Sequence, residues 1–342
     1  MRILIDIGHP AHVHYFKNFI KIMENKKHKL LVIAREKEVT HKLLKNYNIK
    51  FVNRGKGGWT IIGKFFYLIY ANFKIFYYSI KFKPQIFLSF ASPYVAQVSK
   101  LVMKPHIGIT DTEHASLGNF AFMPFTDVIL TPSCFKKELG KKHFRFDSYT
   151  ELFYLHEKFF KPNIDVLKKI NIKRGENFAI VRFVSWDASH DLLENGLSKD
   201  DKISLIDYLS KKMKVFVSSE SSLPKQLEKY KLNIEPEYFH DLLSFSSIYV
   251  GEGGTTASEA AIMGVPSVYI NNLSMGYIDD EINAGLLFQT TNNNEIFKKI
   301  DEILNKNDKK YFKELSKKLI TNKIEPTSFL VSYVENYFSI NR

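Results

Sequence analysis

Short apolar runs alternate with helical patterns through the first half of the chain. Residues 10–23 and 38–46 have the apolar spacing of helices. The runs between them have the length of buried strands and lie at residues 2–7, 30–34, 49–53, 86–90, 106–109, 128–131 and 144–147. Short apolar strands that alternate with helices predict a parallel sheet with helices on both faces.

The same pattern begins again in the second half. Strands are predicted at residues 178–184, 215–219, 248–250 and 267–270, and helices at 200–211, 224–229, 255–263 and 294–304. We therefore expect an α/β chain of two Rossmann-like lobes facing each other across a cleft, where ligands of such folds bind. The predicted parts are residues 1–158, residues 159–325 and a C-terminal helical segment, 326–342, which crosses back to the first lobe.

Residues 59–82 predict a helix with apolar positions almost all round it. Its longest stretch without a charge, residues 65–73, is too short to span a bilayer, which takes ~20 apolar residues. Lys64, Lys74 and Lys81 interrupt the segment. Such a helix either packs inside its lobe or lies in a membrane interface with its lysines toward the headgroups. Burial is the more common outcome, so we expect a buried helix, with peripheral membrane contact as the alternative.

Composition indicates a globular protein of a reducing compartment. Hydrophobic residues make up 45% of the 342 residues, with 29 Phe and 18 Tyr, which predicts an aromatic-rich core. The single cysteine, Cys134, excludes an internal disulfide and a cysteine metal cluster. The chain starts with a strand pattern that contains Asp6, in contrast to an export signal. We therefore expect a cytoplasmic protein.

The excess of positive over negative charge lies in the first hundred residues. The net charge is +13; residues 1–100 hold 18 Lys+Arg and 4 Asp+Glu, and the remainder holds 49 − 18 = 31 against 36 − 4 = 32. Such asymmetry favours an anionic partner, which could be a nucleic acid, an anionic membrane surface or an anionic acceptor. The alternative is that the lysines only solvate the surface, but the excess of positive charge would then be spread over both halves.

A glycine-rich turn between the strand at 247–250 and the helix at 255–263 has the clearest chemistry. The glycines allow a tight turn, and the helix start is expected to face outward with unpaired N–H groups. With the nearby hydroxyls it would bind a phosphate or diphosphate. The residues of this predicted donor site are Gly253, Gly254, Thr255, Thr256 and Ser258.

Glu259 follows one turn further into the same helix. Its carboxylate could accept hydrogen bonds from two vicinal hydroxyls, as on a ribose, and we expect it to be exposed. A strand-to-helix turn in an α/β protein is also often glycine-rich for structural reasons alone. The spacing fits neither the dinucleotide fingerprint nor Walker A.

Three histidines, His9, His12 and His14, follow the first strand at the opening of a helix. Imidazoles ligate zinc, but no acidic ligand lies at helical spacing, so a metal site is disfavoured. A histidine with a pKa near neutrality is better suited to take a proton from an acceptor hydroxyl. The remaining alternative is that these side chains only cap and pack the helix start.

Asp111, Glu113 and His114 follow another predicted strand. Two carboxylates flanking a threonine are unusual in a loop without function, although Asp111 alone could be a helix cap. We expect Glu113 and Asp111 to bind an acceptor or serve as the base, with His114 beside them.

A third cluster follows the first strand of the second half. Arg182 and His190, with Ser185 between them, could neutralise a leaving diphosphate, a role that otherwise falls to a metal ion. We therefore expect no metal and no cofactor. Phe239 and His240 lie shortly before the glycine turn and complete the predicted donor side.

The run from Gly253 to Pro266 resembles the nucleotide-sugar signature of GT-B glycosyltransferases and of the non-hydrolysing UDP-GlcNAc 2-epimerases. The resemblance implies that the glycine turn holds the donor diphosphate, that Glu259 holds the ribose and that Phe239 and His240 hold the nucleobase. It also implies an acceptor-side role for His12, and for His190 a weak likeness to an epimerase histidine. The chain also resembles a prokaryotic family of GT-B-like proteins of unassigned function, often found with surface-polysaccharide genes. The motifs that carry this resemblance lie at residues 8–14, 111–115, 182–191 and 251–255.

We therefore predict a glycosyltransferase that transfers a sugar from a nucleoside diphosphate donor, with UDP favoured, to a glycan or lipid-linked acceptor. A UDP-sugar 2-epimerase of the same fold is the principal alternative. A nucleic-acid-binding protein is a third reading, but the sequence has no recognition helix or aromatic-plus-basic strand motif, so no nucleic-acid partner is expected.

Overall fold

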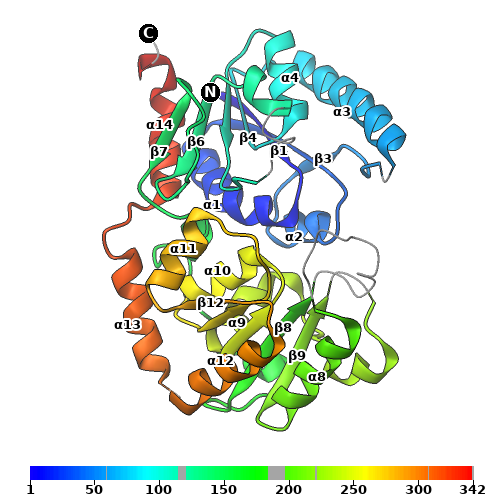
Figure 1. Ribbon diagram of the computed structural model, residues 1–342. Helices are drawn as coiled ribbons and strands as arrows, with labels where there is room; N and C mark the ends of the chain where they lie inside the picture. The colour runs from blue at the N-terminus through cyan, green and yellow to red at the C-terminus, as the bar shows by residue number, and fades with distance from the viewer. Residues whose placement is uncertain (59, 115–120, 184–196, 220–221, 307, 341–342) are drawn as a thin grey trace. The chain divides into compact units, whose positions relative to one another are not determined.

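The computed structural model describes residues 1–58, 60–114, 121–183, 197–219, 222–306 and 308–340. The chain divides into two compact units (Figure 1). The first unit contains Met1–Phe159 and Lys323–Arg342, and the second contains Phe160–Asn322. The chain thus returns to its first unit at its C-terminal end.

The first unit is built on a parallel seven-stranded sheet with the order β3-β2-β1-β4-β5-β6-β7. Strand β1 lies near the centre, where Ile5 pairs with Val32 on one side and Leu88 on the other. Its interior is buried on both faces, as its continuous apolar run predicts. The strands are β1 (Arg2–Ile7), β2 (Lys29–Ala34), β3 (Phe51–Asn53), β4 (Ile86–Phe90), β5 (His106–Ile109), β6 (Val128–Pro132) and β7 (His143–Phe146).

Helices cover both faces of this sheet (Figure 1). Helix α1 begins at Pro10, whose ring fits the first helical position, after His9 as the N-cap residue. The C-terminal helix is tied to the first unit through Glu335, which accepts hydrogen bonds from Lys26 and His28. The helical segments are α1 (Pro10–Asn25), α2 (Thr40–Asn46), α3 (Ile61–Phe82), α4 (Pro93–Leu101), η1 (Met123–Phe125), α6 (Leu152–Leu155) and α14 (Pro326–Ile340).

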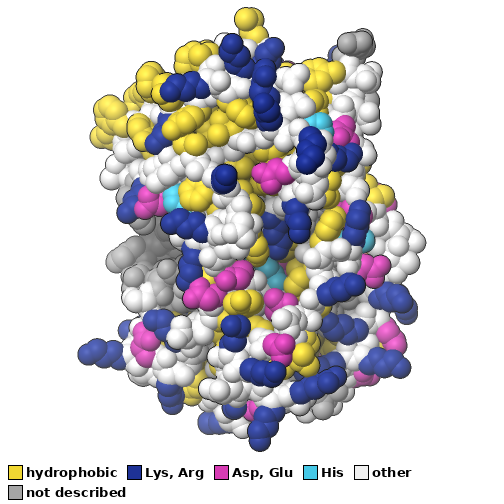
Figure 2. Space-filling model, turned by 180° about the vertical axis from the view of Figure 1, so that it is seen from behind, with side chains coloured by type: hydrophobic (Ala, Val, Ile, Leu, Met, Phe, Trp, Pro, Cys, Tyr) yellow, Lys and Arg dark blue, Asp and Glu magenta, His cyan; other side chains and the backbone are white. Residues whose placement is uncertain are grey.

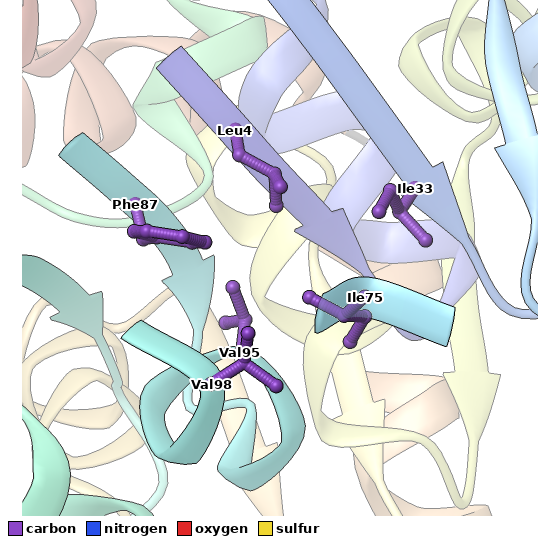
Figure 3. Close-up of a cluster of buried hydrophobic side chains, with 6 residues drawn as sticks. All are labelled: Leu4, Ile33, Ile75, Phe87, Val95 and Val98. Carbon is purple, nitrogen blue, oxygen red and sulfur yellow. The ribbon is translucent and has the colours of Figure 1, made fainter. Parts of the chain in front are cut away.

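Part of the first unit's core lies between the sheet and helices α3 and α4 (Figure 3). Leu4, Ile33 and Phe87 come from three neighbouring strands. They pack against Ile75 of α3 and Val95 and Val98 of α4, and all six side chains are fully buried. Because this cluster joins strands that are distant in sequence, it fixes α3 and α4 on the sheet.

The second unit is built on a parallel five-stranded sheet with the order β12-β11-β10-β8-β9. Its strands are β8 (Phe178–Phe183), β9 (Lys214–Ser219), β10 (Ile248–Gly251), β11 (Ser267–Tyr269) and β12 (Leu287–Gln289). Its helical segments are α7 (Val166–Lys169), α8 (Lys199–Ser210), η2 (Lys225–Tyr230), η3 (Pro236–Tyr238), α9 (Phe239–Phe245), α10 (Gly254–Ile262), α11 (Gly276–Asn283), α12 (Asn293–Lys306) and α13 (Lys309–Ile320). Central strand β10 leads directly into α10.

The largest departure from the sequence expectation is helix α3. Only one stripe of it is buried, at Tyr67, Ala71, Ile75 and Ser79. The opposite side exposes large apolar side chains, of which Phe73 is 71% exposed. The expectation of a buried helix is therefore wrong, because only one residue in each turn of α3 packs against the core. None of the described helices combines the length and hydropathy that crossing a bilayer needs.

Candidate functional site

The strongest candidate site in the second unit is the start of helix α10. Strand β10 ends at Gly251, and Gly253 takes the N-cap position before the helix begins at Gly254. Because a glycine N-cap has no side chain, it cannot satisfy the first N–H groups of the helix as a serine or threonine would. A helix start of this kind favours an anionic ligand, through its N–H groups and its dipole.

The two glycines at the helix start have different surroundings. A Cβ atom on Gly253 would meet only the Tyr249 hydroxyl, at 3.8 Å, so the space over this residue is open. A Cβ on Gly254 would lie 3.1 Å from Met275 Cε and 3.2 Å from Tyr269 Oη, which is tight. Gly254 is thus explained by packing, whereas Gly253 is better explained by the approach of a ligand to the backbone.

Glu259 is paired with His240 inside the second unit. His240 Nε2 lies 2.9 Å from Glu259 Oε1, and both residues are only 5% exposed. An ionised carboxylate only accepts hydrogen bonds, so the imidazole donates in this pair. The expectation that Glu259 is exposed is wrong: its helix packs with α9, which brings His240 over it. His240, expected beside a nucleobase, is the residue that holds this carboxylate in place.

The hydroxyl groups of α10 do not share one environment. Thr255 is half-buried and Thr256 is buried, both in the first turn. Ser258 is fully buried, and its hydroxyl donates to Glu281 Oε1 at 2.5 Å. The expectation that Ser258 contributes to an outward-facing anion site is therefore corrected, because its side chain ties α10 to α11.

Charged groups surround Tyr249 of strand β10. Burial is the main cause that raises the pKa of the Tyr249 hydroxyl, and Arg182, Glu259 and Glu252 all act on it electrostatically. Arg182 lies beside Gly251 in the sheet, and its Nη1 donates to Ser218 Oγ at 3.1 Å. A guanidinium thus lies at the carboxyl end of β8, next to the strand that leads into α10.

Two further features of the second unit are an ion pair at Glu252 and the position of Phe239. Lys202 Nζ forms a buried ion pair with Glu252 Oε1 at 2.7 Å, an interaction that the sequence did not suggest. Phe239 begins α9 and is half-buried, with its ring 5.9 Å from that of His240. Ser185 and His190, both predicted on the donor side, lie outside the described residues.

In the first unit, His9 and His12 lie together at the carboxyl end of β1. The His9 ring accepts from the Ala11 N–H at 3.2 Å as the cap of α1. His12 Nδ1 accepts from the Gly8 N–H at 3.3 Å, and the two rings are 5.9 Å apart. Burial, followed by the positive charges of neighbours that include Arg54, lowers the pKa of His12 well below 6.5. His12 is therefore neutral at pH 7, with its proton on Nε2.

His14 is separated from the other two histidines by the turn of α1. Its ring is buried and packs against Tyr47 and Tyr154, at centroid distances of 5.9 and 5.3 Å. This corrects the expectation that His14 belongs to an acceptor side. Among the residues that the structure describes, no group of three or more His, Cys, Asp or Glu could hold a metal ion.

Asp111 and Glu113 are buried beyond strand β5. The Thr150 hydroxyl donates to Asp111 Oδ2 at 2.7 Å, and the Thr112 hydroxyl donates to Oδ1 at 2.9 Å. Burial raises the pKa of Asp111, and the nearby Glu113 charge adds to this effect. Glu113 Oε1 accepts the Lys136 N–H at 3.2 Å, whereas His114 is exposed. The structure thus brings the Asp111 and Glu113 carboxylates together.

Sequence reasoning missed a buried ion pair next to His12. Arg54 donates to Asp6 through Nε at 2.8 Å and Nη2 at 3.2 Å, and Arg54 Nη1 donates to the Tyr67 hydroxyl at 2.7 Å. Ser92 Oγ also donates to Asp6, at 2.5 Å. A Cβ added to Gly8 would lie 3.5 Å from Arg54 Nη2 and 3.8 Å from the His12 ring. The available signal was a carboxylate in an otherwise apolar central strand.

Comparison with known proteins assigns nearly the whole chain to one family. The model of a family described as "Protein of unknown function (DUF354)" matches residues 1–339. An uncharacterized protein of Methanocaldococcus jannaschii, MJ0665, is 27% identical over 277 residues, which are 77% of this chain and 80% of the relative.

Solved structures of the same fold include epimerases and a glycosyltransferase. S. aureus MnaA with UDP has a TM-score of 0.71 at 12% identity, covering 99% of this chain and 97% of that one. UDP-GlcNAc 2-epimerase from Neisseria meningitidis bound to UDP-GlcNAc has a TM-score of 0.67 at 12% identity, covering 98% and 99%. Spinosyn rhamnosyltransferase SpnG with thymidine diphosphate has a TM-score of 0.66 at 12% identity, covering 98% and 100%. The two parallel-sheet lobes are those of the GT-B fold.

Proposed function

Because the chain belongs to the DUF354 family, whose description assigns no activity, we propose a function from its own residues: a GT-B glycosyltransferase that uses a nucleoside diphosphate sugar, with UDP as the nucleotide. The observation that supports this most is the start of α10, where Gly253 leaves the first N–H groups without a side-chain cap. Glu259, oriented by His240, lies farther along the same helix. The helix start is suited to the diphosphate of a nucleotide, and the Glu259 carboxylate is suited to its ribose hydroxyls.

Each donor-side residue has a proposed role. The N–H groups at Gly253, Gly254 and Thr255 bind the diphosphate, and Glu259 accepts from the ribose hydroxyls. Arg182 stabilises the negative charge that grows on the diphosphate as the bond to the sugar breaks. This arrangement fits transfer because the departing nucleotide must leave with its charge neutralised. We assign His190 the same role as Arg182, Ser185 to donor binding and Phe239 to contact with the nucleobase.

For the acceptor, we propose a glycan or lipid-linked sugar hydroxyl, and Asp111 or Glu113 as the group that takes its proton. The raised pKa of Asp111 brings it closer to the value that suits proton transfer near neutral pH. His12 is a weaker base candidate than the sequence indicated, since its Nδ1 accepts from Gly8 and its Nε2 then carries the proton. It suits hydrogen-bond donation to a substrate oxygen.

The first test is nucleotide binding. We expect UDP to bind in calorimetry with a micromolar to millimolar Kd, and the Gly253→Ala variant to bind it more weakly. Asp111→Asn and Glu113→Gln should keep the affinity for UDP but lose turnover of a UDP-sugar with acceptor, because they are assigned to proton transfer. Failure of the intact protein to bind any nucleoside diphosphate at millimolar concentration would refute the donor assignment.

A UDP-sugar 2-epimerase is the second candidate, because solved structures of this fold include UDP-GlcNAc 2-epimerases. An epimerase needs no acceptor, so the two activities separate in one experiment. The protein is incubated with UDP-GlcNAc alone and followed by NMR. Appearance of the C2 epimer would replace the transferase proposal, whereas release of UDP that depends on added acceptor supports it.

A further inference from the structure

Helix α3 presents a continuous apolar face to solvent. Six of its side chains, at alternating spacings of four and three residues, are exposed by 36% to 71%: Ile62, Phe66, Ile69, Phe73, Phe76 and Ile80. At ~100° per residue they share one side of the helix, opposite the buried stripe that contains Ile75. A contiguous apolar patch on a protein surface marks an interaction site.

One edge of this apolar face is formed by two tyrosine–lysine pairs. Lys74 Nζ donates to the Tyr70 hydroxyl at 3.0 Å, and Lys81 donates in the same way to Tyr77, seven residues further on. Each ammonium also lies over its tyrosine ring, at 5.4 and 4.3 Å from the centroid. Tyrosine rings and lysine stems with an apolar body and a polar end are suited to the boundary between hydrocarbon and headgroups.

The segments next to α3 in sequence carry charge of one sign. Residues 39–110 contain 11 Lys+Arg and no Asp or Glu. In Figure 2 the hydrophobic side chains gather at the upper left of the view, with Lys and Arg side chains beside them. An anionic surface that approaches this face therefore meets attraction without opposing carboxylates from α3 or from the segments next to it in sequence.

A second copy of the chain is a less suitable occupant. The spacing of four and three residues would suit a helix pair, but helix pairs are specified by opposite charges at their flanking positions. Helix α3 contains Lys64, Lys74 and Lys81 and no acidic residue, so pairing two copies would bring like charges together. An anionic lipid surface satisfies both the apolar face and the lysines.

We propose that α3 is a membrane-surface anchor, which inserts its apolar face at the headgroup boundary of a bilayer that contains anionic phospholipid. The helix lies in the plane of the interface, with Lys74 and Lys81 toward the phosphates. This inference does not depend on the proposed enzymatic activity, since it rests on the first unit alone.

The test is sedimentation of the full-length protein with vesicles of phosphatidylcholine, with and without 30% phosphatidylglycerol, at 50 and 500 mM NaCl. At low salt we expect at least about 10-fold stronger binding to the anionic vesicles, and most of this preference should disappear at high salt because the Debye length shortens. Equal binding to both vesicle types, or no binding to either, overturns the proposal.

Matched variants separate the two contributions. Phe66→Ser/Phe73→Ser should weaken binding about 10-fold or more, whereas Phe144→Ser, at another exposed phenylalanine of the same unit, should not. Lys74→Gln/Lys81→Gln should weaken binding, whereas Lys310→Gln/Lys317→Gln removes the same charge from α13 and should leave most of it. UDP affinity should be unchanged in every variant. A dimer in analytical ultracentrifugation that Phe73→Ser dissociates, without vesicle binding, would assign the face to a second copy and refute the anchor.

Discussion

His240 and Glu259 form a buried pair in the second unit, with 2.9 Å between His240 Nε2 and Glu259 Oε1. The contact joins the start of α9 to the middle of α10, and it fixes the direction of a carboxylate near the glycine turn. A carboxylate held in this way is preorganised for hydroxyl groups of a ligand, so that little freedom is lost when the ligand binds.

Glu259→Gln is expected to weaken UDP binding about 10- to 150-fold, which corresponds to the ~1.5–3 kcal/mol of a hydrogen bond to a charged group. The amide keeps the volume and an acceptor for His240, whereas alanine would open a cavity at this buried position. Calorimetry measures the affinity. As the matched control, Ser258→Ala removes the bond to Glu281 and should lower stability without changing affinity. Unchanged UDP affinity in Glu259→Gln removes this residue from the site.

The two glycines at the start of α10 should respond differently to alanine. Gly253→Ala is expected to leave the melting temperature almost unchanged, because its Cβ would meet one atom at 3.8 Å, but to weaken UDP binding. Gly254→Ala is expected to lower the melting temperature, because its Cβ would press on Met275 and Tyr269. Thermal unfolding with and without UDP measures both effects. Equal affinity of Gly253→Ala and wild type would show that no ligand approaches this backbone.

Arg54→Met is expected to destabilise the first unit by about 3–5 kcal/mol, because it leaves the Asp6 carboxylate buried without its cation. Asp6→Asn in the same chain should restore part of the loss, since the remaining group is then neutral. Urea unfolding of the two variants and wild type measures this. If the double variant is less stable than Arg54→Met, the ion pair is not the source of the loss.

His106 should make the first unit sensitive to acid. Burial is the main cause that lowers its pKa from 6.5 to about 3, and its ring nitrogens lie 2.9 Å from the hydroxyls of Ser89 and Thr126. Below pH 6.5 the unfolded chain binds a proton that the folded chain does not, so stability is present above that pH and is lost as the pH falls. The loss from this residue between pH 7 and pH 5 is about 2 kcal/mol.

The variant His106→Gln isolates this contribution. It should be less stable than wild type at pH 7, because a buried hydroxyl loses its partner, but its stability should fall less between pH 7 and pH 5. Urea unfolding at the two pH values gives the difference. An identical fall in both proteins would show that His106 is not the titrating group.

The order of elements and the position of the glycine turn follow from local sequence patterns. Apolar runs predict β1, β8 and β10 because parallel strands are buried on both faces, and Gly264 ends α10 with φ +70°, a conformation that favours glycine. These features depend on near neighbours in the chain.

The directions and contacts of the side chains, in contrast, depend on the tertiary fold. Ser258 faces Glu281 across 23 residues of sequence, Arg54 reaches Asp6 across 48, and α3 turns its apolar face to solvent. Burial depends on which elements pack together, and strands β2, β1 and β4 become neighbours only when the sheet forms. A local apolar pattern therefore predicts a helix at 59–82 but cannot tell a face that meets the core from one that meets another surface.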